Sequence, residues 1–351
     1  HRDLHKAIRR QRQMCIRDGE VLQAMIRMQE TIAETITDVQ TLCAHFLFRD
    51  DFLFAPMQTA NIFDAIVVKV PRDASSFSPR YPAARRSLQD CISAIRQYGL
   101  TKAIVIAEDL SFLHDCPSLT DLIVIPADTV RPPFDFEPLY GMPNLRYLEC
   151  WLMREDEQQP FGTVDYARLQ NLSEVVVEGK GHSNITNLKK LRSFQASDYR
   201  GVNKTLADYP SGDLLEHLSL TSCNLRSLDG IEKSPNIKDL ELTYNRSLAD
   251  ISALYKVADS LRALSVEACG KIQDFSVLHA LTNLEHLHLD GSTHLPDISF
   301  LANMPRLKTF ATTMPIADGD LRPCLAIPYA SVRNRKHHNL KDSELPKNST
   351  H

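Results

Sequence analysis

LEHLSLTSC, residues 215–223, is a pattern that returns three times along the chain, as IKDLELTYN (237–245), LRALSVEAC (261–269) and LEHLHLDGS (284–292). Each copy has an apolar residue at its first, fourth and sixth positions, and Cys, Asn or Ser at its ninth. The copies begin 22, 24 and 23 residues apart, at 215, 237, 261 and 284. Alternating apolar residues predict a β-strand, and their return at this interval predicts an array of stacked repeats.

A second motif follows three of these copies. It reads LADISAL (248–254), IQDFSVL (272–278) and LPDISFL (295–301), and a shorter version occurs at 228–231. Together the two motifs resemble the leucine-rich repeats of internalins and of the leucine-rich regulatory subunits of protein phosphatases. The resemblance covers residues 210–315 well and 101–209 loosely. It implies an α/β leucine-rich-repeat solenoid with a curved parallel β-sheet on its concave side.

Weaker copies extend the array in both directions. They are Leu119/Leu122/Val124, Leu145/Leu148/Cys150, Leu172/Val175/Val177, Leu191/Phe194/Ala196 and, at the other end, Leu307/Phe310/Thr312. The sequence therefore predicts about nine repeats over residues 101–315, with an initial strand near 102–108. Nine strands at about 4.8 Å spacing give a sheet on the order of 40 Å long.

Strand alternation assigns a role to each position of the repeat. The leucines point into the core and the residues between them point to the opposite face. The ninth residue, Asn245 and its equivalents Cys223, Cys269 and Ser292, is expected to turn the chain inward and to satisfy backbone groups there. One repeat buries too few apolar side chains to be stable alone, so the copies must stack.

The flanks are predicted to cap the array. Residues 20–100 give an N-terminal cap with an amphipathic helix over 20–45, a strand over 65–70 and a helix near 85–98, and residues 316–351 give a C-terminal cap and tail. The first helix also fits a partner helix or a short coiled coil. The basic run 333–338 fits either a solvated cap or an anion-binding strip.

The start of the chain needs separate treatment. Residues 11–18, QRQMCIRD, resemble the in-frame translation of the transposon mosaic end used in sequencing libraries. A natural basic helix is the alternative. We therefore interpret residues 1–19 as an artefact or a disordered segment and assign them no function.

Bulk composition excludes some classes of protein. The net charge of −4 lacks the basic excess that nucleic-acid binding requires, and no apolar run is long enough to span a membrane. The eight cysteines include no Cys-x-x-Cys pair, so neither a zinc site nor a redox motif is indicated. We expect reduced thiols and a cytoplasmic protein, with secretion left open because the start of the chain is uncertain.

The repeat register also predicts a partner-binding face. We expect a protein partner, with a basic patch, to contact the concave strand positions. These are Tyr147, Trp151, His217, Asp239, Glu241, Tyr244, Glu267, His286, His288 and Asp290. Trp151, the chain's one tryptophan, fits an interface anchor, or else a residue covered by the N-terminal cap.

One motif is a candidate for metal binding. It is His286-x-His288-x-Asp290, in which strand alternation places three polar side chains on one face. A His-x-His pair on a strand can bind a metal, with Glu267 as a further ligand, but histidine is also an ordinary residue of such a face. No phosphate loop or nucleophile set is visible. We predict no metal, no cofactor and no catalysis. The alternatives are the substrate-recognition part of a larger enzyme with an upstream catalytic domain, and a structural scaffold without a dedicated partner.

Overall fold

The computed structural model describes residues 52–55, 57, 64–75, 83–153 and 159–348. The chain divides into two compact units, His1–Asn144 and Leu145–His351. The helix expected over 20–45 and the segment 1–19 lie outside the described residues.

The first unit holds a small sheet and one longer helix. Its elements are β1 (Phe54–Ala55), β2 (Ala65–Val70), α4 (Leu88–Tyr98), β3 (Lys102–Ala107), the 3-10 helix η1 (Ser111–Asp115), β4 (Asp121–Pro126) and α5 (Glu137–Tyr140). β1 is antiparallel to β2, whereas β2, β3 and β4 are parallel. Ser87 and Asp90 form a capping box at the start of α4, and Gly99 ends the helix in the left-handed region at φ 60°. The expected strand over 65–70, helix near 85–98 and strand near 102–108 are all present.

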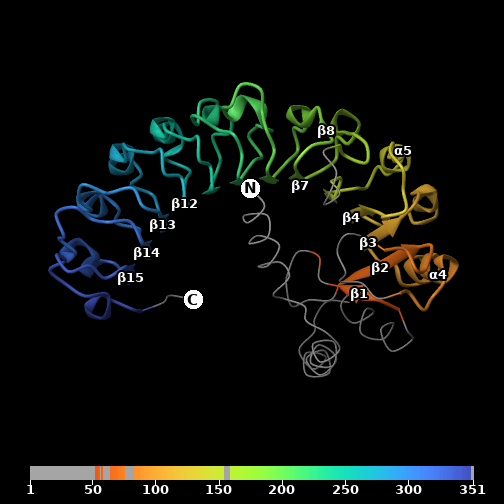
Figure 1. The fold of residues 1–351 in the computed structure, drawn as a ribbon, viewed down its shortest axis with the longest axis horizontal. Helices are drawn as coiled ribbons and strands as arrows, with labels where there is room; N and C mark the ends of the chain where they lie inside the picture. Colours follow the sequence, from red (N-terminus) through yellow and green to blue (C-terminus); the bar gives the residue numbers. More distant parts are fainter. Residues whose placement is uncertain (1–51, 56, 58–63, 76–82, 154–158, 349–351) are drawn as a thin grey trace. The chain divides into compact units, whose positions relative to one another are not determined.

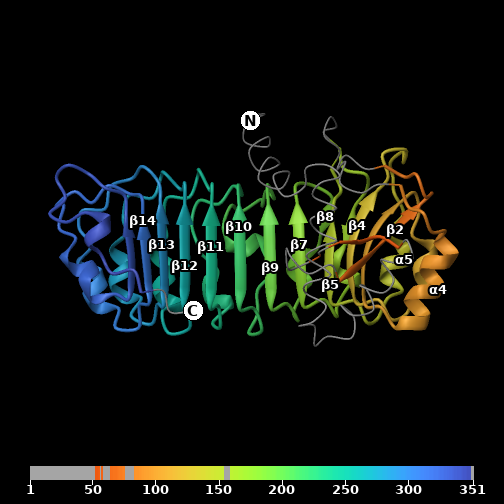
Figure 2. The same cartoon turned by 90° about the horizontal axis from the view of Figure 1, so that it is seen from below.

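The second unit is a regular parallel sheet. Its strands are β5 (Tyr147–Cys150), β7 (Glu174–Glu178), β9 (Ser193–Ser197), β10 (His217–Thr221), β11 (Asp239–Thr243), β12 (Ala263–Glu267), β13 (His286–Asp290), β14 (Thr309–Thr312) and β15 (Tyr329–Val332). They pair in this order, each parallel to the next. Figure 2 shows these strands side by side. β15 adds a strand beyond residue 315, where the sequence analysis ended the repeats.

Short 3-10 helices occupy the other side of this unit. They are η2 (Tyr166–Arg168), η3 (Ile185–Asn187), η4 (Leu206–Asp208), η5 (Ile231–Lys233), η6 (Ser252–Val257), η7 (Ser276–Ala280), η8 (Ser299–Asn303) and η9 (Arg322–Ala326). One more 3-10 helix, η10 (Asp342–Glu344), packs against β15. A separate parallel pair is formed by β6 (Val164–Asp165) and β8 (His182–Ser183). Within residues 145–348 the strands line the inner side of the arc and the 3-10 helices η2–η9 its outer side (Figure 1). The predicted leucine-rich-repeat fold is confirmed.

The Asp-Ile-Ser motif starts the outer helices. In each of η6, η7 and η8 the aspartate two residues before a serine accepts that serine's backbone N–H, at 2.8, 2.8 and 2.7 Å. In η6 the hydrogen bonds from Ser252 hold the pKa of Asp250 below its usual range. The Ile or Phe between the aspartate and the serine is buried. The motif therefore caps the start of the helix and also fixes that helix to the core.

The ninth residue of the repeat forms the expected ladder. Asn245 is fully buried, and its Nδ2 donates to the carbonyl oxygens of Leu220 (2.7 Å) and Thr243 (3.2 Å). Cys223 and Cys269 are also buried, and their thiols donate to carbonyls of their own strand and of the preceding one, at 3.4–3.7 Å. Burial raises the pKa of both thiols to about 11, so they keep the proton that they donate.

The fourth copy departs from this ladder. Ser292 was expected at the ninth position, but it is exposed, and Thr293 is buried instead with Oγ1 3.4 Å from the carbonyl oxygen of Gly270. The preceding residue, Gly291, has φ 154°, whereas Ser222, Tyr244 and Ala268 at the same place have φ 52–55°. The chain therefore leaves β13 in another direction, which shifts the inward residue by one position.

Candidate functional site

The strand side chains that point away from the leucine core are called outward, and they lie on the inner, concave side of the arc. Strand register arranges these side chains in three rows across β10–β14. Row 1 is His217, Asp239, Ala263, His286 and Thr309. Row 2 is Ser219, Glu241, Ser265, His288 and Ala311. Row 3 is Thr221, Thr243, Glu267 and Asp290. The leucines and valine between the rows are at most 3% exposed, so the core holds each row in place.

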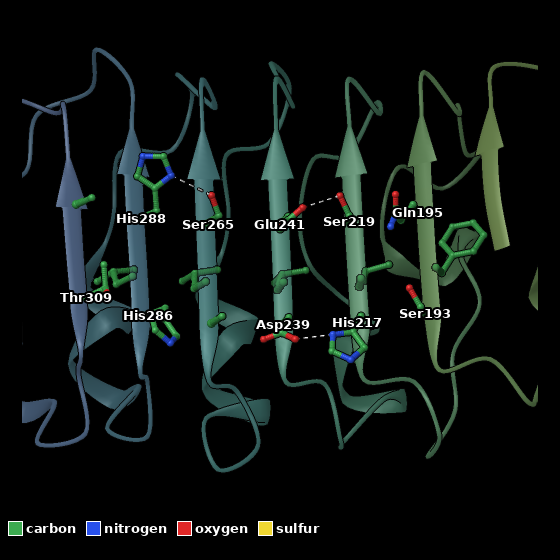
Figure 3. A pocket seen from close by; sticks show the side chains of 17 residues that line it. Ser193, Gln195, His217, Ser219, Asp239, Glu241, Ser265, His286, His288 and Thr309 are labelled. Atoms are coloured by element: carbon green, nitrogen blue, oxygen red, sulfur yellow. Dashed lines mark hydrogen bonds and ion pairs between the residues drawn. The ribbon is translucent and has the colours of Figure 1, made fainter. Parts of the chain in front are cut away.

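Rows 1 and 2, with Ser193 and Gln195 of β9, line a groove of about 570 Å³ on this face. These residues belong to the neighbouring strands β9–β14, and Figure 3 shows their side chains on one face of the sheet. Five of the predicted site residues come together here: His217, Asp239, Glu241, His286 and His288.

The other predicted residues lie elsewhere. Glu267 and Asp290 are in row 3, beside the groove, and Asp290 accepts a hydrogen bond from Thr313. Tyr147 is on β5 and is buried (6% exposed), and Trp151 follows that strand.

The expected strand position of Tyr244 is wrong. β11 ends at Thr243, and Tyr244 is the left-handed residue of the following turn, at φ 53°. Its backbone N–H donates to the carbonyl oxygen of Glu267 (2.9 Å), as Ser222 and Ala268 do to the next strand in their own repeats. The alternation of apolar residues does not show where a strand ends. The prediction therefore extended the strand by one residue into the turn.

Three side-chain contacts order the groove. His217 Nδ1 contacts an Asp239 carboxylate oxygen, the Ser219 hydroxyl donates to Glu241 Oε2 (3.0 Å), and Ser265 Oγ lies 3.4 Å from His288 Nδ1 (Figure 3). All three contacts join neighbouring strands. Each therefore orients a polar group without removing it from the surface.

Sequence reasoning missed the small residues between the charged ones. Ala263 and Ser265 lie on β12, between the acids of β11 and the histidines of β13. Their short side chains leave the middle of the groove open. The repeat register already places Ala263 and Ser265 on this face. A search for reactive side chains does not select an alanine or a serine that is important only because it is small.

Charge on this face has one sign. Its carboxylates at outward positions of β5, β7 and β9–β14 are Glu149, Glu174, Glu178, Asp239, Glu241, Glu267 and Asp290, and none of those positions is Lys or Arg. Two of the cations just before the strands are paired with acids of adjacent repeats. Lys238 Nζ is 2.9 Å from Glu216 Oε1, and Lys308 Nζ is 2.5 Å from Glu285 Oε2. Arg262, just before β12, instead donates from Nη1 to the carbonyl oxygens of Asp259 (2.8 Å) and Leu261 (3.1 Å). The outward positions of the strands themselves carry acids and neither Lys nor Arg, so they form a negatively charged surface.

The β5 end of the face is internally bonded. Glu149 accepts the Tyr147 hydroxyl at Oε2 (2.9 Å) and the Trp151 indole N–H at Oε1 (2.6 Å). Both carboxylate oxygens are therefore already used by donors of the same chain. This arrangement fixes the two aromatic rings around one acid.

Reactive groups do not converge on the groove. The six cysteines in the described ranges, among them Cys223 and Cys269, are buried, and burial raises their thiol pKa values. Within the described residues, no three His, Cys, Asp or Glu side chains gather closely enough to hold a metal. His286 and His288 stand on one strand with their neighbours on β12 too short to contribute a ligand. The arrangement suits contact with another molecule through hydrogen bonds and charge.

Residues 145–348 form a leucine-rich-repeat solenoid, since each repeat contributes one parallel strand, a turn and a 3-10 helix. Neither a protein-family model nor a curated protein matches the chain.

Among solved structures the chain is similar to an internalin of Listeria monocytogenes (InlF), with 14% identity over 70% of this chain and 73% of that one and a TM-score of 0.46. Internalin C2 of the same organism aligns at 21% identity over 52% and 74%, with a TM-score of 0.32. A leucine-rich-repeat protein of Leptospira interrogans aligns at 13% identity over 65% and 76%, with a TM-score of 0.30. The fold assignment itself rests on this chain's own register and turn ladder.

No helix among the described residues has both the length and the apolar character needed to cross a membrane.

Proposed function

We propose that the outward sheet face of β9–β14 binds a protein partner and that this chain recognises rather than catalyses. One observation carries the proposal: the groove offers polar groups of one charge sign that its own chain leaves available. Within the described part of the chain, the side chains of Glu267 and His286 make no hydrogen bond or ion pair. Asp239 and Glu241 each have one contact with a neighbouring strand.

The size and rigidity of the face support this function. Six strands at about 4.8 Å spacing place the outer two about 24 Å apart, the length of an extended segment of about seven residues. The backbone beneath is fixed by strand pairing and by the Asn245 and cysteine ladder. A rigid face loses little conformational entropy when a partner binds, which favours affinity.

The charge of the face favours a protein over a nucleic acid. Phosphate backbones bind where cations gather, and the outward positions of β5, β7 and β9–β14 have none. The buried thiols add to the case for a binding role, because a protonated thiol held in a turn is no nucleophile. They also support a reducing, cytoplasmic location as part of the same proposal.

The test is affinity capture with the full chain as bait, beside two charge-reversed double variants. Asp239→Lys with Glu241→Lys alters the groove. Asp213→Lys with Asp259→Lys makes the same change of charge at two exposed aspartates in the turns before β10 and β12.

The proposal predicts a protein that wild type and the turn variant retain and that the groove variant loses, with circular dichroism unchanged in all three. A protein retained equally by all three would place its binding outside the groove and contradict the proposal. Equal loss from both variants would show a general effect of charge.

A further inference from the structure

The middle of the groove has the form of a channel along β12. We call it the β12 channel: Ala263 and Ser265 form its floor, Asp239 and Glu241 its first wall, and His286 and His288 its second. Glu267, the next outward residue of β12, closes one end. The two walls stand on strands two spacings apart, which is about 9.6 Å. That width admits one extended side chain between them.

The lining of the β12 channel matches a long cationic side chain. The methyl group of Ala263 offers an apolar floor to an alkyl stem, as in lysine or arginine side chains that cover apolar surface while the charge stays in water. Carboxylates stand beside the floor at Asp239 and Glu241 and at its end at Glu267. A charge-assisted hydrogen bond to one of them is roughly twice as strong as a neutral one.

The second wall and the margin of the channel are compatible with a cation supplied by a partner. The second wall carries imidazoles, which in their neutral form do not repel a cation and can accept a hydrogen bond. The cations that precede β11, β12 and β14 have contacts of their own. Lys238 and Lys308 pair with Glu216 and Glu285. Arg262 donates to the carbonyl oxygens of Asp259 and Leu261. The acids of the channel therefore favour a partner that supplies positive charge.

The spacing of the acids fits an extended chain. Asp239 and Glu241 are alternate residues of β11, and Ala263, Ser265 and Glu267 alternate along β12. Alternate residues of any extended segment are about 6.6 Å apart, so a segment laid along β12 repeats at the same interval as rows 1 to 3. Side chains at every second position of such a segment meet successive rows.

We propose that the β12 channel recognises an extended segment of a partner protein that carries lysine or arginine at alternate positions. This inference rests on the proposed function and names the partner's chemistry. Row 1 receives the first cation at Asp239, row 2 the second at Glu241, and row 3 the third at Glu267. Specificity comes from the match in spacing, and affinity comes from charge pairs formed over a small-residue floor.

The test is fluorescence anisotropy with the full chain and two labelled peptides, at an ionic strength of about 0.15 M, where the Debye length is about 8 Å. Gly-Ser-Lys-Ser-Lys-Ser-Lys-Ser-Gly places its lysines at alternate positions. Gly-Ser-Ser-Lys-Lys-Lys-Ser-Ser-Gly has the same composition with the lysines contiguous. We expect the alternate peptide to bind at least about threefold tighter, since only its lysines reach three rows at once.

Neutral variants of nearly the same shape separate the channel from general charge. Asp239→Asn with Glu241→Gln should weaken the alternate peptide by about tenfold, the equivalent of about 1.4 kcal/mol. Asp213→Asn with Asp259→Asn removes two charges from the turns and should change affinity less than about twofold, because exposed charges beyond a Debye length are screened. Ala263→Lys places a cation on the floor and should also weaken binding about tenfold.

Equal binding of the two peptides, equal effects of the two neutral double variants, or no binding of either peptide would each overturn the inference. If the peptides fail while the capture experiment still depends on Asp239 and Glu241, the recognition function stands and the partner's chemistry is different. If capture does not depend on these residues, the recognition function itself fails.

Discussion

The β5 end and the β11–β13 part of the sheet both present acids on the same face, and they use them differently. At β5, one carboxylate is shared between Tyr147 and Trp151, which satisfy both its oxygens. At β11–β13, the side chains of Asp239 and Glu241 have single contacts, and those of Glu267 and His286 make no hydrogen bond or ion pair within the described part of the chain. Acidic residues on a repeat face are therefore no guide to binding until their partners are counted.

The turns of the two regions differ as well. After β10, β11 and β12 the ninth position holds Cys223, Asn245 and Cys269, which reach back to the preceding strand. By the same count the ninth positions after β7 and β9 hold Lys180 and Tyr199. The region with the available face is thus also the one with the regular ladder beneath it, and a firm backbone is what a preorganised binding face needs.

The largest stability difference between the regions is expected at this ladder. Asn245→Ala removes the amide donor to the Leu220 carbonyl oxygen and one of two donors to the Thr243 carbonyl oxygen, which keeps the Ser222 N–H. We expect a loss of about 2 kcal/mol in the free energy of unfolding. Lys180→Ala, at the same repeat position but exposed, should change it by no more than about 0.5 kcal/mol. Urea unfolding of both variants measures this, and equal losses would remove the distinction between the two kinds of turn.

A pH effect is expected in the irregular region. Burial lowers the pKa of His182 to about 4, with Tyr166 Oη 3.1 Å from its Nδ1. A histidine that stays neutral in the folded state takes up its proton only on unfolding, so its contribution is lost as pH falls from about 6.5 towards 4.

Between pH 7 and 5 this costs roughly 1–2 kcal/mol of stability. The variant His182→Gln is neutral at every pH, so its free energy of unfolding should fall by that much less between pH 7 and pH 5. Matched urea titrations of wild type and variant measure this difference. The same pH dependence in wild type and variant would show that His182 takes up its proton over the same pH range in the folded and the unfolded protein.

A smaller effect is expected at the satisfied acid of β5. Glu149→Gln replaces one carboxylate oxygen by an NH₂ group, so one of the Tyr147 and Trp151 donors loses its acceptor. We expect a loss of about 1 kcal/mol and a shift in the emission of Trp151, the only tryptophan of the chain.

Glu241→Gln is the matched change in the available region. It should leave both the stability and the tryptophan emission close to those of wild type. A large destabilisation by Glu241→Gln would show that the acids of the groove are structural.

The sequence predicted more of the fold than of the site. Leucine spacing located β10–β14, because a strand that buries every second residue must show that period. Counting could not reveal that Tyr244 lies in a left-handed turn, or that Gly291 redirects the chain so that Thr293 replaces Ser292 inside. It named the acids and histidines of the groove, but the channel depends on Ala263 and Ser265, whose importance is their small size and becomes visible only between their neighbours.

The most direct test of the account is zero-length carbodiimide cross-linking of the alternate-lysine peptide to the full chain, followed by mass spectrometry. This chemistry joins a lysine only to a carboxylate that it touches. We predict cross-links at Asp239, Glu241 and Glu267. Cross-links at Glu174 and Glu178 instead, or spread evenly to Asp213 and Asp259, would contradict the claim that the available acids of β11 and β12 form the binding site.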